Sequence, residues 1–96
     1  MKPVKVGICG LGTVGGGTFN VLKRNAEEIA RRAGRGIEVA QIAARATNPQ
    51  CDTTGTPISS DVFEVACNPE IDIVIELIGG YTVARDLVLK AIENGK

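Results

Sequence analysis

The feature that most constrains the fold of this chain is the segment of residues 4–15, which reads VKVGICGLGTVG. A short β-branched run leads directly into a G-x-G-x-x-G turn over residues 10–15, and a helical pattern follows the turn. In a βαβ unit, this order of strand, glycine turn and helix binds the pyrophosphate of a dinucleotide. The N-terminus of such a helix presents free N–H groups and the positive end of its dipole to the phosphates. The sequence therefore predicts a nucleotide-binding site at this turn.

Each glycine of the turn has a separate predicted role. Gly10 permits the tight turn out of the strand, Gly12 lets the backbone approach the pyrophosphate, and Gly15 lets the helix pack against the strand. Glycine-rich turns also occur for purely structural reasons, so the prediction depends on the strand before the turn and the helix after it. The predicted pyrophosphate site comprises Gly10, Leu11, Gly12, Thr13, Val14 and Gly15.

Composition limits the partners and the chemistry of the chain. Its 96 residues suffice for one small domain, and 11 basic residues balance 11 acidic ones, so no net field favours nucleic acid or an anionic membrane. No apolar run approaches the roughly 18 residues of a membrane span, and no signal peptide is recognisable, so we expect a cytoplasmic protein. The chain has no His, and Cys9, Cys51 and Cys67 match no metal-binding or C-x-x-C spacing. We therefore predict free thiols, with Cys9 in the core, and neither catalytic nor metal-ligating residues.

Hydrophobic periodicity and turn residues predict a βαβαβα order. The expected strands are residues 4–9, 37–45 and 71–78, and the expected helices are 13–33, 61–66 and 82–93, with a loop over 46–60. We expect Ser60 and Thr82 to cap the second and third helices, and Val83, Leu87 and Ala91 to be buried in the third. This order predicts an α/β fold: a Rossmann-type half of three parallel strands with flanking helices.

Such a half places its strands in the order 3-2-1, and the next strand of a complete domain pairs beside strand 1. No further strand follows residue 93, so the edge of strand 4–9 is expected to be open and prone to aggregation. We therefore expect an incomplete nucleotide-binding domain over residues 1–96, truncated before the fourth strand and lacking its catalytic domain. The alternative is a small stand-alone nucleotide-binding module.

The end of the second strand bears on the choice of nucleotide. An acidic residue there would bind the ribose hydroxyls of NAD, but residues 43–47 read AARAT. Arg45 is placed to pair its guanidinium with the 2′-phosphate of NADP, and Thr47 and Asn48 could add neutral donors. The alternative is that Arg45 is a solvated strand end. NADP(H) is therefore favoured, and NAD(H) remains possible because nothing excludes it.

The segment ELIGG, residues 76–80, forms a second cluster at the carboxyl end of the third strand, where ligands of open α/β folds bind. Gly79 and Gly80 would let the backbone pass close to the nicotinamide ribose. Glu76 has two possible roles, as an acceptor for loop N–H groups or as a partly buried structural acid, and we do not expect it to be a catalytic base.

Taken together, three segments resemble the N-terminal cofactor domain of homoserine dehydrogenase: GICGLGTVGGG, IAAR and DIVIELIGGYTVARDLVLKAIENGK. The resemblance runs essentially end to end. It implies NAD(P)-dependent reduction of L-aspartate 4-semialdehyde to L-homoserine, on the route to threonine, methionine and isoleucine. By position it implies that residues 10–15 hold the pyrophosphate, that Arg45 meets the 2′-phosphate, and that Ile78, Gly79 and Gly80 line the ribose and nicotinamide. Family members often carry a second Arg after the first, where this chain has Ala46, which weakens the expected preference for NADPH without reversing it.

The resemblance also implies that the catalytic lysines, the substrate-binding acids and the metal-binding loop lie outside this chain. The chain alone is then expected to bind a small-molecule cofactor without turnover, and the full-length enzyme is expected to be a homo-oligomer. Two alternatives remain open from the sequence. One is the cofactor domain of a different small-substrate reductase, such as a dihydrodipicolinate reductase or an aspartate-semialdehyde dehydrogenase. The other is a non-catalytic module that senses the redox state of the cofactor.

Overall fold

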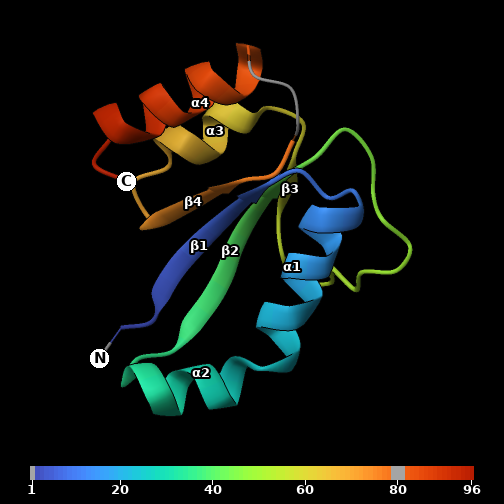
Figure 1. Ribbon diagram of the computed structural model, residues 1–96, viewed down its shortest axis with the longest axis vertical. Coiled ribbons are helices and arrows are strands. Elements are labelled where there is room, and N and C mark those ends of the chain that lie inside the picture. The colour runs from blue at the N-terminus through green and yellow to red at the C-terminus, as the bar shows by residue number, and fades with distance from the viewer. Residues whose placement is uncertain (1, 79–81) are drawn as a thin grey trace.

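The computed structural model describes residues 2–78 and 82–96, and in them four parallel strands form one sheet in the order β3-β2-β1-β4 (Figure 1). The elements, in chain order, are β1 Val4–Cys9, α1 Thr13–Arg24, α2 Ala26–Ala33, β2 Ile37–Ala43, β3 Ile58–Ser59, α3 Val62–Cys67, β4 Ile73–Glu76 and α4 Thr82–Glu93. The α/β class and the Rossmann-type arrangement are those predicted from the sequence.

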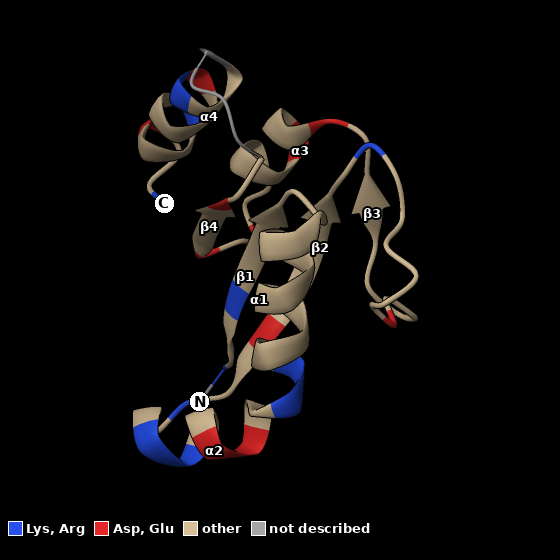
Figure 2. Cartoon of the chain, turned by 45° about the vertical axis from the view of Figure 1, so that its right-hand side comes forward, with Lys and Arg blue, Asp and Glu red and all other residues tan. Residues whose placement is uncertain are grey.

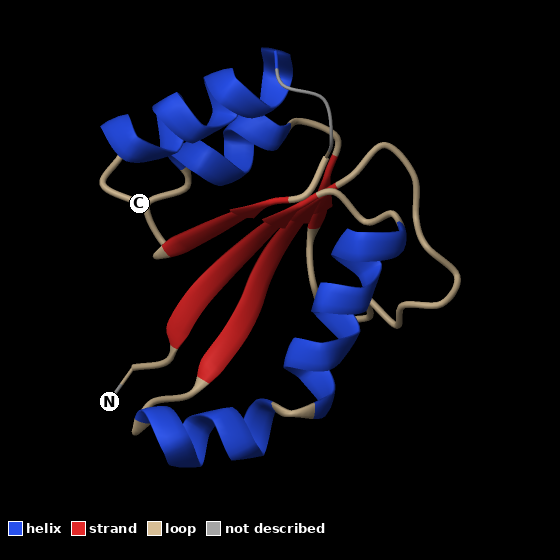
Figure 3. Cartoon of the chain, viewed as in Figure 1, coloured by secondary structure: helices blue, strands red, loops and turns tan. Residues whose placement is uncertain are grey.

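The helices cover both faces of the sheet (Figure 3). Helix α1 packs on one face, α3 and α4 pack against each other on the other, and α2 lies near the N-terminus of the chain. Alternate residues of β1 therefore enter two different clusters: Val6 and Ile8 lie with Phe19 of α1, whereas Cys9 lies with Val65 of α3. A strand buried on both faces explains the mostly apolar run from which β1 was predicted.

The predicted number and order of strands was wrong. Residues predicted as the third strand form β4, which pairs with the edge of β1 expected to be open, with Val6 opposite Ile73 and Cys9 opposite Glu76. The strand beyond β2 is β3, a two-residue strand inside the predicted loop of residues 46–60. Two residues are too few to produce a hydrophobic period, which is why the sequence showed no strand there. The fourth strand is thus present, and β1 is paired on both sides.

The single helix predicted over residues 13–33 is two helices separated at Asn25. Asn25 has φ −103° and ψ 15°, outside helical values, and its side-chain amide donates to the carbonyl oxygen of Val21 at 3.0 Å. A short polar side chain that bonds the preceding turn competes with the backbone ladder, and such residues commonly bend or end helices. The second helix then ends at Gly34, whose φ of 74° is left-handed, and its last residue, Ala33, is the predicted one.

The predicted N-cap of α3 and the predicted buried face of α4 are each wrong in one residue. The N-cap of α3 is Asp61 rather than Ser60, because the Asp61 carboxylate accepts the N–H of Phe63 at 2.9 Å. The side chain of Thr82, predicted to cap the last helix, lies outside the described part of the chain. The bounds of α4 are as predicted, but its buried face is Ala84, Leu87 and Ala91, whereas Val83 is 48% exposed.

The three cysteines are free, as predicted, and Cys9 is fully buried. Burial, and secondarily the negative charge of Glu76, raises the pKa of the Cys9 thiol to about 12. In the part of the chain that the structure describes, no helix is long and apolar enough to cross a membrane.

Candidate functional site

Two glycines of the segment that joins β1 to α1, Gly10 and Gly15, are enclosed by contacts that leave no room for a side chain. Gly10 has a φ of +108°, and a Cβ built on it would lie 2.7 Å from the carbonyl oxygen of Leu77. Its N–H donates to the carbonyl oxygen of Ala43 at 2.7 Å, so the turn is held from the ends of both β2 and β4. A Cβ on Gly15 would lie 2.0 Å from the carbonyl oxygen of Gly10. The first turn of α1 therefore packs against the backbone of the glycine turn too closely for a side chain at position 15.

Gly12 differs from these two glycines, because a Cβ built on it would meet nothing within 4 Å. It is the N-cap of α1, and having no side chain, it makes no side-chain bond to the first-turn N–H groups. The first turn of α1 contains no acidic residue, and it is drawn uncharged in Figure 2. An uncapped helix start with open space beside Gly12 is suited to bind an anion through backbone N–H groups.

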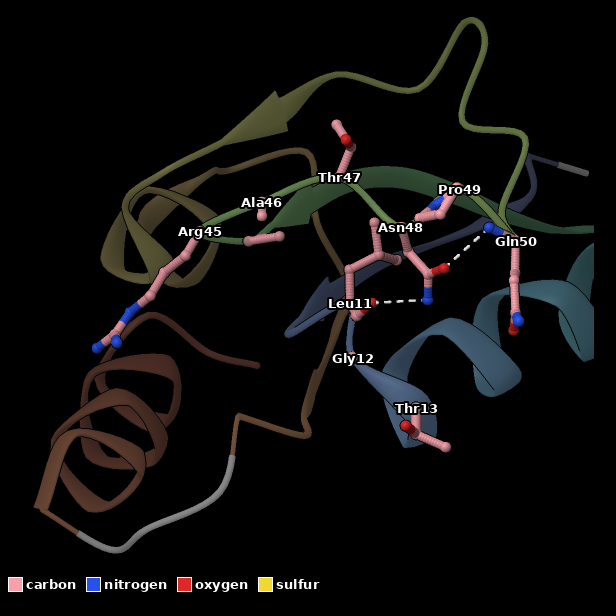
Figure 4. Close-up of a pocket in the computed structure, with 10 residues that line it drawn as sticks. Leu11, Gly12, Thr13, Arg45, Ala46, Thr47, Asn48, Pro49 and Gln50 are labelled. Atoms are coloured by element: carbon pink, nitrogen blue, oxygen red, sulfur yellow. Dashed lines mark hydrogen bonds between the residues drawn. The ribbon is translucent and has the colours of Figure 1, made fainter.

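A cleft of about 490 Å³ lies between this turn and the segment after β2 (Figure 4). Its lining includes Leu11, Gly12 and Thr13 on one side and residues 44–50 on the other. Arg45 is exposed at the rim, and its side chain extends away from Gly12 and Thr13. Among the described residues that line the cleft, Arg45 is charged and the others are uncharged. The structure thus brings Arg45 to the cleft without directing its guanidinium into it.

Asn48 has a role that the sequence did not reveal. Its side-chain amide donates to the carbonyl oxygen of Leu11 at 3.0 Å, and its side-chain oxygen accepts the N–H of Gln50 at 2.9 Å (Figure 4). The sequence left open that Asn48 could offer a donor to the nucleotide, but its amide nitrogen is bonded to the glycine turn. The Asn48-Pro49 dipeptide is a turn signal, yet the distant partner of the side chain has no signal in the sequence.

The exit from β4 lies directly against the glycine turn. The N–H of Leu77 donates to the carbonyl oxygen of Cys9 at 2.9 Å, and the N–H of Ile78 donates to the Glu76 carboxylate at 2.8 Å. Both roles considered for Glu76 are therefore found, since it is half-buried and accepts a loop N–H. Ile78 is half-buried beside Gly10. The predicted site residues Gly79 and Gly80 lie outside the described residues.

The site has the features of a binding surface. The carboxyl ends of β1, β2 and β4 meet the start of α1, the location at which open α/β folds bind ligands. The nearby thiol of Cys9 is buried, and its pKa of about 12 keeps it protonated and unreactive near neutral pH. Within residues 2–78 and 82–96, no group of three or more His, Cys, Asp or Glu side chains is arranged to hold a metal ion.

Comparison with known proteins identifies the family. The sequence model of the family described as homoserine dehydrogenase, NAD binding domain, matches residues 10–96. The chain belongs to this family. Membership confirms the resemblance found in the sequence, and it supports a nicotinamide dinucleotide as the small-molecule ligand of the domain.

Individual homoserine dehydrogenases agree with this assignment. The enzyme of Pseudomonas aeruginosa is 84% identical over 96 residues, and that of Methylobacillus glycogenes is 60% identical over 98 residues; each match covers the whole chain. The solved structure of a homoserine dehydrogenase from Thiobacillus denitrificans is 56% identical and superposes over the whole chain with a TM-score of 0.89. The chain spans 22%, 24% and 22% of these three proteins, respectively.

Proposed function

We propose that this chain is the cofactor-binding part of a homoserine dehydrogenase, and that it binds NADP(H) in preference to NAD(H). The longer protein would reduce L-aspartate 4-semialdehyde to L-homoserine. Family membership supports the reaction, and the uncapped start of α1 at the open Gly12 position carries the cofactor assignment. When bound, the nicotinamide supplies the hydride, and this chain binds and orients the dinucleotide.

The pyrophosphate site consists of residues of the glycine turn and of the first helical turn. Gly10 and Gly15 shape the turn, since neither leaves space for a side chain. Backbone N–H groups at the start of α1 would bind the phosphate oxygens, with Gly12 leaving the approach open. The members of this proposed site are Gly10, Leu11, Gly12, Thr13, Val14 and Gly15.

The preference for NADP(H) rests on charge in the cleft. Its described lining holds no carboxylate that could accept hydrogen bonds from the ribose hydroxyls of NAD, and it does hold Arg45. A guanidinium pairs with a 2′-phosphate through charge-assisted, bidentate bonds. Because Arg45 is exposed, its side chain must turn toward the cleft and lose rotamer freedom, so we expect a moderate preference of about tenfold.

The third part of the proposed site is the exit from β4. Ile78, Gly79 and Gly80 would line the ribose and nicotinamide of the cofactor. The contact of Ile78 with Gly10 supports this assignment, because it places the exit beside the pyrophosphate turn. The Glu76 carboxylate holds this exit through the N–H of Ile78.

The cofactor assignment is tested by titrating the chain with NADPH and with NADH and following nucleotide fluorescence, since the chain has no Trp. We expect NADPH to bind about tenfold more tightly, and Arg45→Ala to remove that difference, about 1.4 kcal/mol. Arg24→Ala, which removes the same charge at the far end of α1, is the control and should change neither affinity. Equal affinities in the wild type, or a preference that survives Arg45→Ala, would refute the role of Arg45.

The activity is tested in a chimera. This chain replaces the matching 22% of the Pseudomonas aeruginosa enzyme, and oxidation of NADPH dependent on aspartate semialdehyde is measured. We expect activity from the chimera and no turnover from the isolated chain. A folded chimera without activity would refute the assignment to this reaction.

A further inference from the structure

Four contacts fasten the loop after β2 to the glycine turn and α1. The Asn48 amide donates to the carbonyl oxygen of Leu11 at 3.0 Å, and the Asn20 amide donates to the carbonyl oxygen of Gln50 at 3.1 Å. The other two are the Cys51 thiol, 3.5 Å from the carbonyl oxygen of Gly16, and the Lys23 ammonium, 2.9 Å from that of Asp52. Three of these contacts reach the helix itself, and the contact of Asn48 alone among them reaches the turn that precedes it.

The Asn48 side chain is held firmly in this position. Its oxygen accepts the N–H of Gln50, and its nitrogen lies only 2.5 Å from the place a Cβ on Gly16 would occupy. The half-buried amide therefore sits directly against the backbone of α1, with both of its polar ends engaged. A side chain fixed at both ends can impose an orientation on the group it contacts.

That group is the peptide between Leu11 and Gly12. The described part of the chain contains no cis peptide, and in a planar trans peptide the C=O and the N–H point in opposite directions. With the Leu11 carbonyl held toward Asn48, the N–H of Gly12 must point away from the loop. A rotation of this peptide would reverse both groups and present a carbonyl oxygen, instead of a donor, to an anion at the turn.

We propose that Asn48 is a positioning residue for the pyrophosphate: by holding the Leu11 carbonyl, it keeps the N–H of Gly12 oriented as a phosphate donor at the start of α1. This inference rests on the proposed function, since it concerns the same dinucleotide site. It differs from a role in recognising the 2′-phosphate, because the amide nitrogen is bonded to the carbonyl oxygen of Leu11 in the glycine turn.

The test uses two nucleotides that separate the ends of the cofactor. ADP carries a pyrophosphate and no 2′-phosphate, whereas 2′-AMP carries a 2′-phosphate and no pyrophosphate. We expect Asn48→Ala to weaken the binding of ADP, NADH and NADPH by about tenfold each, because a backbone donor to a charged oxygen is lost. The affinity for 2′-AMP and the ratio of the NADPH and NADH affinities should stay as in the wild type.

Asn20→Ala is the matched control, because it removes a side-chain amide of α1 that bonds the same loop, without touching the Leu11 carbonyl. It should leave ADP binding unchanged. Asn48→Asp is the second variant, should Asn48→Ala fail to fold: it keeps an acceptor for Gln50 and loses the donor to Leu11. Its loss of ADP affinity should persist at high salt, where repulsion between exposed charges is screened.

The possible outcomes distinguish the two proposals. A wild-type chain that is folded by circular dichroism and binds no nucleotide would overturn both the proposed function and this inference. A wild type that binds ADP, together with unchanged affinity in the Asn48 variants, would overturn the inference alone. Equal losses of ADP affinity in Asn20→Ala and Asn48→Ala would also overturn the inference, because Asn48 would then act only by holding the loop in place. A loss of affinity confined to 2′-AMP would overturn it as well, because Asn48 would then act at the 2′-phosphate.

Discussion

Substitution of alanine for single glycines should separate the glycines that the fold requires from the one that the cofactor requires. At Gly15 the added methyl group would lie 2.0 Å from the carbonyl oxygen of Gly10. This distance is shorter than an ordinary van der Waals contact by more than about 1 Å. Both partners are backbone, so α1 must move away from the turn. Overpacking of this kind lowers the free energy of unfolding by about 3 kcal/mol, and the better helix propensity of Ala raises it by about 1 kcal/mol. The expected net loss of stability for Gly15→Ala is about 2 kcal/mol.

At Gly12 the same methyl group meets nothing within 4 Å, and φ is −74°, a value that alanine adopts readily. A poorer N-cap and a less flexible unfolded chain oppose each other, so Gly12→Ala should change stability by less than about 1 kcal/mol. Its methyl group would instead occupy the space through which we propose that the pyrophosphate approaches. We therefore expect Gly12→Ala to fold like the wild type and to lose NADPH binding.

Gly17 supplies the control, because it lies inside α1 with nothing within 4 Å of an added Cβ. Gly17→Ala should stabilise the chain by about 1 kcal/mol and leave NADPH binding unchanged. Stability is measured by urea unfolding followed by far-UV circular dichroism, and binding by NADPH fluorescence. A Gly15→Ala variant as stable as the wild type, or a Gly12→Ala variant that still binds NADPH at full affinity, would refute this assignment of roles.

Two further predictions concern local chemistry. Asp61→Ala should destabilise the chain by about 1 kcal/mol, because it removes the N-cap of α3, whereas Ser60→Ala should have a smaller effect. Thermal unfolding compares the two variants, and a larger loss of stability for Ser60→Ala would contradict the cap assignment. The pKa of Cys9 is raised in the folded state, so its contribution to stability is complete below its unfolded pKa near 9 and is lost as pH rises toward 12. Urea unfolding between pH 8 and about 11 should therefore show a fall in stability that is smaller in Cys9→Ala, and an equal fall in both proteins would contradict it.

Several features of the fold could be predicted because their causes are local. The strand, the glycine turn and the following helix lie within one continuous segment, and Gly34 and Gly95 end helices through their own left-handed φ angles. Errors arose where a local signal was misassigned or too short. Ser60 and Asp61 are both good caps in adjacent positions, and only the bond to Phe63 distinguishes them. The two residues of β3 are recognisable as a strand only through their pairing with β2.

Within the candidate site, the sequence located the segments but not the directions of their side chains. Arg45 was expected to face the 2′-phosphate, and the structure places its guanidinium away from the turn. Glu76 had two possible roles, and the structure shows both, since the side chain is half-buried and accepts the N–H of Ile78. Asn48 could have offered a donor to the ligand, but its amide donates to the Leu11 carbonyl, 37 positions away. Contacts at such separations depend on how the strands are ordered, which no local pattern encodes.

The sequence by itself determined the α/β class, the glycine turn and the membership of a cofactor-binding family, since each follows from residue types at short spacing. Tertiary structure alone decided that residues 73–76 pair beside β1, because parallel pairing brings together segments that lie far apart in the chain. It also decided which glycines are enclosed and which is open, because the space around a residue is set by neighbours from other elements. For that reason the class of the fold could be predicted from the chain, while the order of the strands and the distinction between enclosed and open glycines required the packed molecule.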